Sequence, residues 1–540
     1  MTDTVSPRKT AHEAFLGSRN VDAGLFARLS EGITVADASP GAREPLPTLA
    51  PFTGERLASV PQCTDEDVRE AAHRAREAQE AWARRSIAER ARVFLRYHDL
   101  VMERQELILD LMQLETGKAR GHAFEEVLDA AITARYYARS AARHLKTRRR
   151  QGALPGLTLA REERRPKGLV ALISPWNYPF TLAASDAVPA LLAGNAVLLK
   201  PDRKTSFTAL LAVRLLREAG LPPDLFAVVT GEGEPLGEPL IRSADYVGFT
   251  GSTEVGRHIA RLAGEALIGC TLELGGKNAS LVLDDADLDR AVEGTLRGCF
   301  ANAGQLCIST ERLFVQAGIY SRFVERFAER VRSMKLGGGL RYGPEMGSLI
   351  SAEQLATVER HVGDAVGKGA RVLAGGRARP DLGPFFYEPT VLEGARAGME
   401  LFADETFGPV VSVSRFTSVD EAVERANDSP YGLNASVWTR DARRGYAVAR
   451  RLEAGTVNVN EAYAAAWAST DAPMGGMKTS GLGRRHGAEG ILKYTEAQTV
   501  AVQRLFPVTA PANVPGERYA RVMTGALRAL KAASRLPGLR

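Results

Sequence analysis

Two apolar runs, Leu-Val-Ala-Leu-Ile at residues 169–173 and Ala-Val-Leu-Leu at residues 196–199, decide the fold class. Two more short apolar runs follow at 226–229 and 246–249, and helix-like stretches such as 207–219 separate them. Buried strands that alternate with helices indicate βαβ units and a parallel sheet. We therefore predict a doubly wound α/β domain that binds its ligands beyond the carboxyl ends of the strands.

A second α/β pattern follows, with strand-like runs at 279–283, 410–416, 435–439 and 456–459. Helix-like segments lie between these runs, which again predicts strands covered by helices. Residues 1–50 are rich in Pro, Gly and charge, and we expect a loosely ordered arm there. The chain is therefore expected to be an α/β protein with two α/β domains.

The composition excludes several classes of protein. The chain has 540 residues, of which 45% are apolar and 25% charged, as in ordinary globular proteins. Its net charge is only +6 (70 Lys and Arg, 64 Asp and Glu), without the basic clustering that nucleic-acid binding requires. There is no run of 18 apolar residues, so no membrane span is expected. The four scattered cysteines lack metal-ligand spacing, so we expect no metal site and a cytoplasmic location.

Three segments at predicted strand ends suit a dinucleotide, and the first, Gly231-Glu232-Gly233, follows the third strand. Gly251 and Ser252 open a helix after the fourth strand, where free N–H groups can face a phosphate. Lys200-Pro201-Asp202-Arg203-Lys204 follows the second strand, where dinucleotide folds reach the adenosine ribose. Three cations against the single Asp202 favour NADP, whose 2′-phosphate they would meet, with NAD as the alternative.

The candidate nucleophile is Cys307, in Asn-Ala-Gly-Gln-Leu-Cys at 302–307. Three further motifs accompany it: Glu273 in Glu-Leu-Gly-Gly-Lys, Asn177 in Pro-Trp-Asn-Tyr-Pro, and Glu405 in Glu-Thr-Phe-Gly-Pro. In this order and at this spacing, the chain over roughly residues 45–505 resembles the aldehyde dehydrogenase superfamily. Within it, the chain is most similar to bacterial NADP-dependent succinate-semialdehyde dehydrogenases.

The resemblance implies a role for each of these residues. Cys307 would attack the aldehyde carbon as a thiolate, and the Asn177 amide with the Cys307 N–H would hold the oxyanion. Glu273 would act as the general base that activates the hydrolytic water. Glu405 would hold the nicotinamide ribose, with Phe407 beside it. The resemblance also implies cofactor contacts at Trp176, Asn177, Lys200, Pro201, Asp202, Arg203, Gly251, Ser252 and Leu274.

The identity of the aldehyde is less well indicated. Succinate-semialdehyde dehydrogenases carry an arginine at two positions that are Asp186 and Ala301 here, and Asp186 would repel a carboxylate. Arg297 and Arg312 are the remaining candidate cations. Residues 463–467, with Tyr178, instead suggest an aromatic funnel for an apolar aldehyde. Succinate semialdehyde is the expectation, and a medium-chain or aromatic aldehyde is the alternative.

The family resemblance also implies domain boundaries, an oligomeric state and an alternative reaction. A CoA-acylating enzyme is a further alternative, but it would have no use for a water-activating Glu273. Family members are usually homodimers or homotetramers, joined through the strands near 150–165 and 499–505. The predicted parts are an N-terminal arm at 1–45, a dinucleotide-binding domain at 46–147 and 166–272, an oligomerisation arm at 148–165 and 490–510, a catalytic domain at 273–470, and a basic tail at 511–540.

Overall fold

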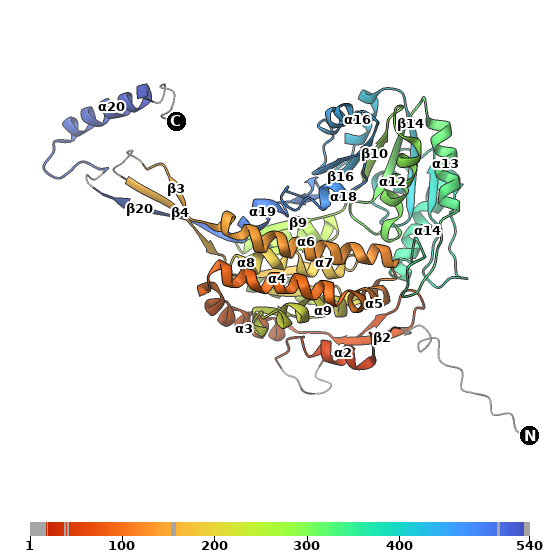
Figure 1. Ribbon diagram of the computed structural model, residues 1–540, viewed down its shortest axis with the longest axis horizontal. Helices are drawn as coiled ribbons and strands as arrows, with labels where there is room; N and C mark the ends of the chain where they lie inside the picture. The colour runs from red at the N-terminus through yellow and green to blue at the C-terminus, as the bar shows by residue number, and fades with distance from the viewer. Residues whose placement is uncertain are drawn as a thin grey trace, which may run out of the picture. The chain divides into compact units, whose positions relative to one another are not determined.

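A computed structural model describes residues 18, 20–36, 39, 43–152, 158–504 and 508–533 of the chain (Figure 1). The chain divides into two compact units. Unit 1 consists of Met1–His144 and Pro166–Thr495, and unit 2 consists of Leu145–Arg165 and Glu496–Arg540. Both of the α/β patterns found in the sequence lie in unit 1.

The first sheet of unit 1 has six strands in the order β19-β9-β8-β5-β6-β7. Its strands are β5 (Leu169–Ser174), β6 (Ala196–Pro201), β7 (Phe226–Val228), β8 (Tyr246–Thr250), β9 (Gly269–Glu273) and β19 (Gly481–Leu482). β5 to β9 are parallel, and only the short β19 runs antiparallel, against β9. Because the strand order reverses on either side of β5, loops from β5 and β8 leave side by side at the carboxyl edge. The predicted α/β class is confirmed.

Helices pack against both faces of this sheet. On one face α3 and α10 contact β5, and α11 contacts β8 and β9. On the other, α7 and α8 contact β6, and α9 packs on α7 with α4 and α5 beyond it. The helices of this part of unit 1 are α3 (Asp65–Arg84), α4 (Ile87–Glu103), α5 (Gln105–Thr116), α6 (Arg120–Leu145), α7 (Pro179–Ala184), α8 (Ala187–Leu192), α9 (Ser206–Glu218), α10 (Gly233–Ser243) and α11 (Thr253–Glu265).

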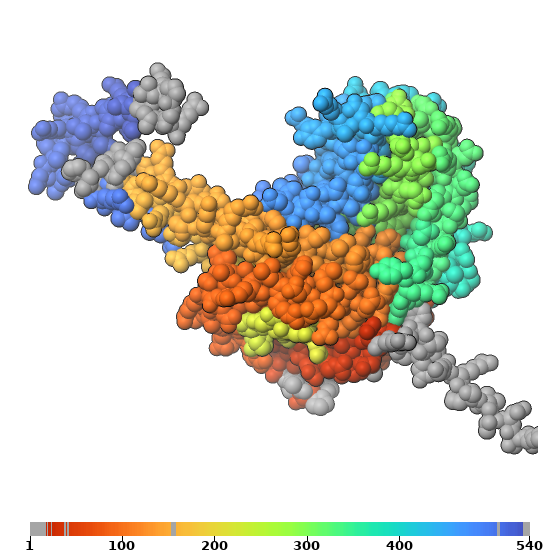
Figure 2. Space-filling model, viewed as in Figure 1, coloured from red at the N-terminus to blue at the C-terminus, as the bar shows by residue number. Residues whose placement is uncertain are grey.

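The second sheet has seven strands in the order β12-β13-β14-β11-β10-β16-β17. They are β10 (Asn278–Val282), β11 (Thr310–Gln316), β12 (Arg371–Ala374), β13 (Thr390–Glu393), β14 (Val410–Phe416), β16 (Asn434–Trp438) and β17 (Thr456–Val459). All neighbours are parallel except β12 and β13. Figure 2 shows the green and blue surface of this part meeting the orange surface of α4 and α6 within unit 1.

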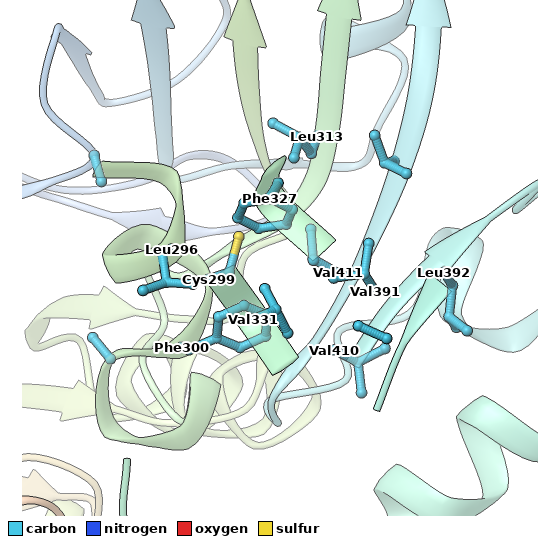
Figure 3. Close-up of a cluster of buried hydrophobic side chains, with 14 of the residues drawn as sticks. Leu296, Cys299, Phe300, Leu313, Phe327, Val331, Val391, Leu392, Val410 and Val411 are labelled. Carbon is cyan, nitrogen blue, oxygen red and sulfur yellow. The ribbon is translucent and has the colours of Figure 1, made fainter. Parts of the chain in front are cut away.

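Two hydrophobic clusters pack the second sheet, one on each face. The larger lies under α12 (Leu288–Phe300), α13 (Tyr320–Arg332) and α14 (Ala352–Gly367), and the smaller under α16 (Val419–Asn427) and α17 (Ala442–Ala449). In Figure 3 the sulfur of Cys299 points among Leu296, Phe327 and other apolar side chains of the larger cluster. Cys299 is therefore a core residue, which leaves Cys307 as the thiol of interest in this region.

The remaining elements of unit 1 are short. They are β1 (Pro45–Leu49), β2 (Arg56–Pro61), α15 (Glu400–Ala403), β15 (Tyr431–Gly432), α18 (Ala464–Trp467), β18 (Met477–Lys478) and α19 (Gly487–Leu492), with 3-10 turns at Arg203–Thr205, Pro223–Leu225 and Ala301–Gly304. β1 pairs with β2 and β15 with β18, each as an antiparallel ribbon. These ribbons and turns connect the larger layers.

The expectation of a loosely ordered arm over residues 1–50 is wrong for part of that range, which also includes β1. Residues 23–30 form α2 (Ala23–Ser30), which begins with the Asp22 side chain accepting a hydrogen bond from Leu25 N. Leu25, Phe26 and Leu29 are buried, and the Phe26 ring lies 4.9 Å from that of Phe207 on α9. This apolar face outweighs the helix-breaking composition around it. Residues 1–17 lie outside the described residues.

In its described residues, unit 2 contains a three-stranded sheet in the order β20-β4-β3 and one helix. These elements are β3 (Arg148–Arg150), β4 (Thr158–Pro166), β20 (Thr495–Gln503) and α20 (Gly516–Ala533). β3 and β4 form an antiparallel hairpin, and the predicted strand at 499–505 begins earlier, at Thr495. Residue 505 lies outside the described residues. Within the described part of the chain, no helix, α20 included, is long and apolar enough to cross a membrane.

Candidate active site

Asn177 lies in the turn between β5 and α7, at the carboxyl edge of the first sheet. Its side chain is buried, and its amide Nδ2 donates to the backbone oxygen of Gln305 (3.2 Å). Gln305 is two residues before Cys307, so this bond ties the turn after β5 to the segment that carries the thiol. Asn177 and Cys307 line the same pocket, although 130 residues separate them in the sequence.

A buried ion pair fixes the turn that carries Asn177. Lys118 Nζ donates to the backbone oxygen of Asn177 (2.7 Å) and pairs with Glu126, and both side chains are fully buried. Glu126 in turn accepts hydrogen bonds from the backbone N–H groups of Phe180 (2.8 Å) and Thr181 (3.1 Å). Burial lowers the pKa of Lys118 and raises the pKa of Glu126, so each charge depends on its partner. The pair therefore holds both ends of the segment 177–181.

Removing one member of this pair is expected to destabilise the protein strongly. Lys118→Met leaves the Glu126 carboxylate buried without a cation, and such a loss costs about 3–5 kcal/mol in unfolding free energy. Chemical denaturation measures it. The matched control is Arg242→Met, because Arg242 forms an exposed pair with Glu238, and such surface pairs contribute about 0–1 kcal/mol. Equal losses in both variants would show that the buried pair has no special role.

Cys307 follows a turn in which the chain reverses after α12. Asn302 and Ala303 adopt left-handed backbone conformations (φ 51° and 54°), which are uncommon for residues other than glycine. Cys307 itself is half-buried, and burial, with the carboxylates of Glu405 and Glu273 nearby, raises the pKa of its thiol to about 12. The resting thiol is therefore neutral and needs a base to become a nucleophile.

Two glycines bring three functional segments together. A Cβ on Gly275 would lie 2.4 Å from a carboxylate oxygen of Glu405, and a Cβ on Gly276 would lie 2.7 Å from the backbone oxygen of Cys307. Only glycine permits approaches this close. The motif that begins with Glu273 thus packs directly against the segments that carry Cys307 and Glu405.

Glu273 lies at the end of β9 and is buried. Its Oε1 atom has no hydrogen-bond partner among the described residues. Burial raises the pKa of Glu273 to about 7, with the cation of Arg485 opposing the shift. A carboxylate with a free lone pair and a pKa near neutrality is suited to accept and return protons at physiological pH.

The second group of predicted residues lies around Glu405. Glu405 Oε1 accepts a hydrogen bond from Gly276 N (2.9 Å), and burial raises the pKa of Glu405 to about 8. The Trp176 ring meets the Phe407 ring edge-to-face at 5.4 Å, so the end of β5 contacts the loop that follows Glu405. Leu274 N donates to Ser480 O (2.8 Å), so the backbone of Leu274 has only its carbonyl left for a ligand.

The basic segment after β6 is less positive than its sequence indicates. Arg203 forms an ion pair with Glu232 (2.6 Å), and the Asp202 side chain accepts a hydrogen bond from Lys204 N (2.9 Å). Lys200 is buried, and burial lowers the pKa of its amine. Glu232 was expected only as part of a glycine turn, because the 29 positions that separate it from Arg203 hide their pairing in the sequence. A ligand phosphate would therefore compete with Glu232 for Arg203.

The turn after β8 presents the end of a helix. Ser252 caps α11 by accepting a hydrogen bond from Val255 N (3.4 Å), and Gly251 N donates to the backbone oxygen of Glu273 (3.0 Å). A Cβ on Gly251 would lie 2.4 Å from the Phe249 ring. Gly251 thus joins the glycine turn to the strand end that carries Glu273.

A family model described as "Aldehyde dehydrogenase family" matches residues 38–500. The chain belongs to the aldehyde dehydrogenase family. It is an oxidoreductase, and the family and enzyme class predicted from the motifs are confirmed.

Relatives of this aldehyde dehydrogenase agree with that placement. A Mycolicibacterium smegmatis protein, provisionally named succinate-semialdehyde dehydrogenase [NADP(+)], is 51% identical over 95% of this chain and 98% of its own length. A crystal structure of an E. coli NADP-dependent enzyme is 36% identical (TM-score 0.82, 85% of this chain and 95% of that one). The Staphylococcus aureus betaine aldehyde dehydrogenase in complex with NAD+ is 31% identical (TM-score 0.83, 90% and 98%).

A pocket in unit 1 reaches Cys307. Its walls carry both apolar and charged side chains. The lining residues are Glu125, Asp129, Asn177, Tyr178, Thr181, Leu182, Leu306, Cys307, Ile308, Tyr463, Trp467, Met474, Arg485 and His486. The predicted aromatic funnel is represented by Tyr178, Tyr463 and Trp467.

The structure changes the interpretation of Asp186. Asp186 is not a free repulsive charge, because its Oδ1 accepts a hydrogen bond from Arg485 Nε (2.9 Å). Of the other candidate cations, Arg297 pairs with Glu125, and Arg312 donates to three backbone oxygens, those of residues 277, 425 and 426. Neither of these two lines the pocket. Arg485 was not among the residues predicted from the sequence. The one indication of it was Asp186, an acid at a position where an arginine was expected.

Proposed function

We propose that this aldehyde dehydrogenase oxidises succinate semialdehyde to succinate with NADP, through covalent catalysis at Cys307. The observation that carries the proposal is the convergence of three groups: Cys307 and Asn177 line one pocket, and Glu273 lies close enough to affect the thiol's pKa. The 51% identical relative supports the choice of substrate and cofactor.

In this reaction the Cys307 thiol gives its proton to a water molecule, and Sγ then attacks the aldehyde carbon. The negative charge that develops on the aldehyde oxygen needs fixed donors, and the Asn177 amide, held in place through Lys118, supplies one. The backbone N–H of Cys307 supplies the other. Once the carbon is oxidised, a thioester links it to Cys307, and Glu273 takes a proton from the water that hydrolyses this bond.

The residues around the glycine turns are suited to hold a nicotinamide cofactor. Gly251 and Ser252 would offer the N-terminus of α11 to the phosphates. Glu405 would hold the nicotinamide ribose, with Phe407 beside the ring. When bound, NADP supplies the two-electron acceptor for the oxidation. The basic residues Lys200 and Arg203 would bind its 2′-phosphate, and NAD is the alternative because Glu232 offsets Arg203.

The cofactor choice is testable at Arg203. Arg203→Glu is expected to lower the NADP/NAD ratio of kcat/KM by about 10- to 100-fold, the effect of one charged hydrogen bond. Glu232→Gln should move the ratio the other way, because it frees Arg203. Steady-state kinetics with each cofactor measures both, with the exposed Arg214→Glu as control. A ratio that Arg203→Glu leaves unchanged would remove the 2′-phosphate assignment.

A second candidate substrate class has its own support. Tyr178, Tyr463 and Trp467 in the pocket favour a medium-chain or aromatic aldehyde. The test is the rate of NADPH formation by the purified protein with succinate semialdehyde, hexanal and benzaldehyde. Succinate semialdehyde should give the highest kcat/KM, and a higher value for hexanal would contradict the proposed substrate. If product forms only with added CoA, the protein is instead a CoA-acylating enzyme.

We further propose that the protein is a cytoplasmic homo-oligomer joined through unit 2. β20 is an edge strand of its sheet, and Val500 and Val502 on it are exposed. An exposed edge with apolar side chains favours pairing with another chain. The four cysteines are free thiols, which supports a reducing compartment.

A further inference from the structure

The pocket that reaches Cys307 contains one cation on its wall, Arg485, among the described lining residues. Arg485 follows β19, and its backbone is bridged to Met474 in an antiparallel pair. Asp186, just before α8, accepts from its Nε at 2.9 Å, and both side chains are mostly buried (11% and 17% exposed). A guanidinium held at one nitrogen keeps a fixed direction.

The rest of this guanidinium is available to a ligand. Within the described residues, no hydrogen bond to protein occupies the Nη1 or Nη2 atoms of Arg485. His486, which is 5% exposed, lines the pocket beside it, and its Nδ1 atom is buried without a partner in the described part of the chain. Two adjacent side chains thus bring unpaired polar atoms to the same pocket, and buried polar atoms in proteins are nearly always paired.

The acidic side chains of the pocket already have donors. Glu125 accepts hydrogen bonds from Tyr463 (3.0 Å), Tyr178 (3.3 Å) and Arg297 (3.1 Å). Asp129 accepts from the hydroxyls of Thr181 on α7 and of Ser185, the residue that follows α7. The N–H donors of Arg485 therefore remain without an acceptor in the pocket. A ligand group that matches them is a negatively charged hydrogen-bond acceptor.

We propose that Arg485, oriented by Asp186 and assisted by His486, binds the distal carboxylate of the aldehyde substrate. This inference rests on the proposed function, because it names the group that selects succinate semialdehyde over an uncharged aldehyde. It also explains Asp186: the acid that replaces an expected arginine brings another arginine to the pocket from a segment 299 positions away. Arg485 is thus a substrate-binding residue, and Asp186 is a positioning residue.

The experiment compares succinate semialdehyde with its methyl ester, which has the same carbon chain without the charge. kcat/KM is measured for both substrates with saturating NADP, in the wild-type protein and in Arg485→Gln, Arg485→Lys and Arg297→Gln. Arg297→Gln is the matched control, because Arg297 also lies beside the pocket but is paired with Glu125 and does not line it.

The expected result is a wild-type preference for the acid over the ester. Arg485→Gln should lower this preference by about 10- to 100-fold, through KM for the acid, as expected for loss of a charged hydrogen bond. Arg485→Lys should restore part of it, and Arg297→Gln should leave it unchanged. If Arg485→Gln proves unstable, the comparison of Arg485→Lys with wild type still measures the loss of the forked guanidinium.

Other outcomes separate the two proposals. If the wild-type protein oxidises neither compound, the proposed function fails. If it prefers the acid but Arg485→Gln slows acid and ester equally, or Arg297→Gln removes the preference, Arg485 is not the carboxylate site and the proposed function stands. A wild-type protein that oxidises the ester at least as well as the acid also overturns the carboxylate site.

Discussion

Cys307→Ala is expected to abolish aldehyde oxidation, lowering kcat by at least about 10⁴-fold, because without the sulfur no covalent intermediate forms. The residue lines the pocket that Asn177 also lines, and no other cysteine does so among the described residues. NADPH formation with succinate semialdehyde measures the loss. Equilibrium binding of NADP by the same variant should remain close to wild type.

The control for this variant is Cys270→Ala. Cys270 is a free thiol near the start of β9, the strand that ends at Glu273, and it does not line the pocket. Its replacement should leave kcat within about threefold of wild type, since substitutions away from a site change energies by about 0.5 kcal/mol or less. Oxidation by Cys307→Ala at the wild-type rate would refute the assignment of the nucleophile.

Glu273→Gln is expected to slow steady-state turnover by about 10²- to 10⁴-fold, the usual contribution of a general base. Because the amide cannot take a proton from water, the enzyme should accumulate as the thioester at Cys307. A rapid first turnover of NADPH should therefore precede the slow phase in stopped-flow measurements. The exposed Glu265→Gln, whose partner is Arg261 on α11, is the control and should show no such burst.

The same carboxylate gives this prediction a pH dependence. The pKa of Glu273 is raised to about 7, and the base acts only when it is deprotonated. Wild-type kcat should therefore rise as the pH increases through about 7 and level off above it, and the rise should be missing from the slow phase of Glu273→Gln. A wild-type profile that is flat between pH 6 and 8 would exclude Glu273 as the rate-determining base.

Much of the fold, and the central candidate residues, could be predicted from patterns in the sequence. The strands at 169–173 and 196–199 are apolar throughout because both faces of their sheet are covered, so their burial is visible in the sequence. Asn177, Glu273 and Cys307 were identifiable because their motifs, in this order and at this spacing, resemble those of the aldehyde dehydrogenase superfamily. The helix Ala23–Ser30 was missed because the polar segments around it masked a single apolar face.

The long-range contacts that shape the pocket could not be predicted from the sequence. Lys118 reaches Asn177 across 59 positions, and Arg485 reaches Asp186 across 299. Each is an ordinary basic residue in its local sequence, and its importance comes from burial beside one partner. The same holds for Arg203, whose excess charge in the sequence is offset by Glu232 in space.

The sequence by itself determined the α/β class, the family and the order of the motifs, because hydrophobic periodicity and short turn motifs are properties of neighbouring residues. Only the tertiary structure decided which charges meet. Charge pairing depends on distances between residues far apart in the chain, and burial sets its strength, so Asp186 counts as a partner of Arg485 only once the chain is folded.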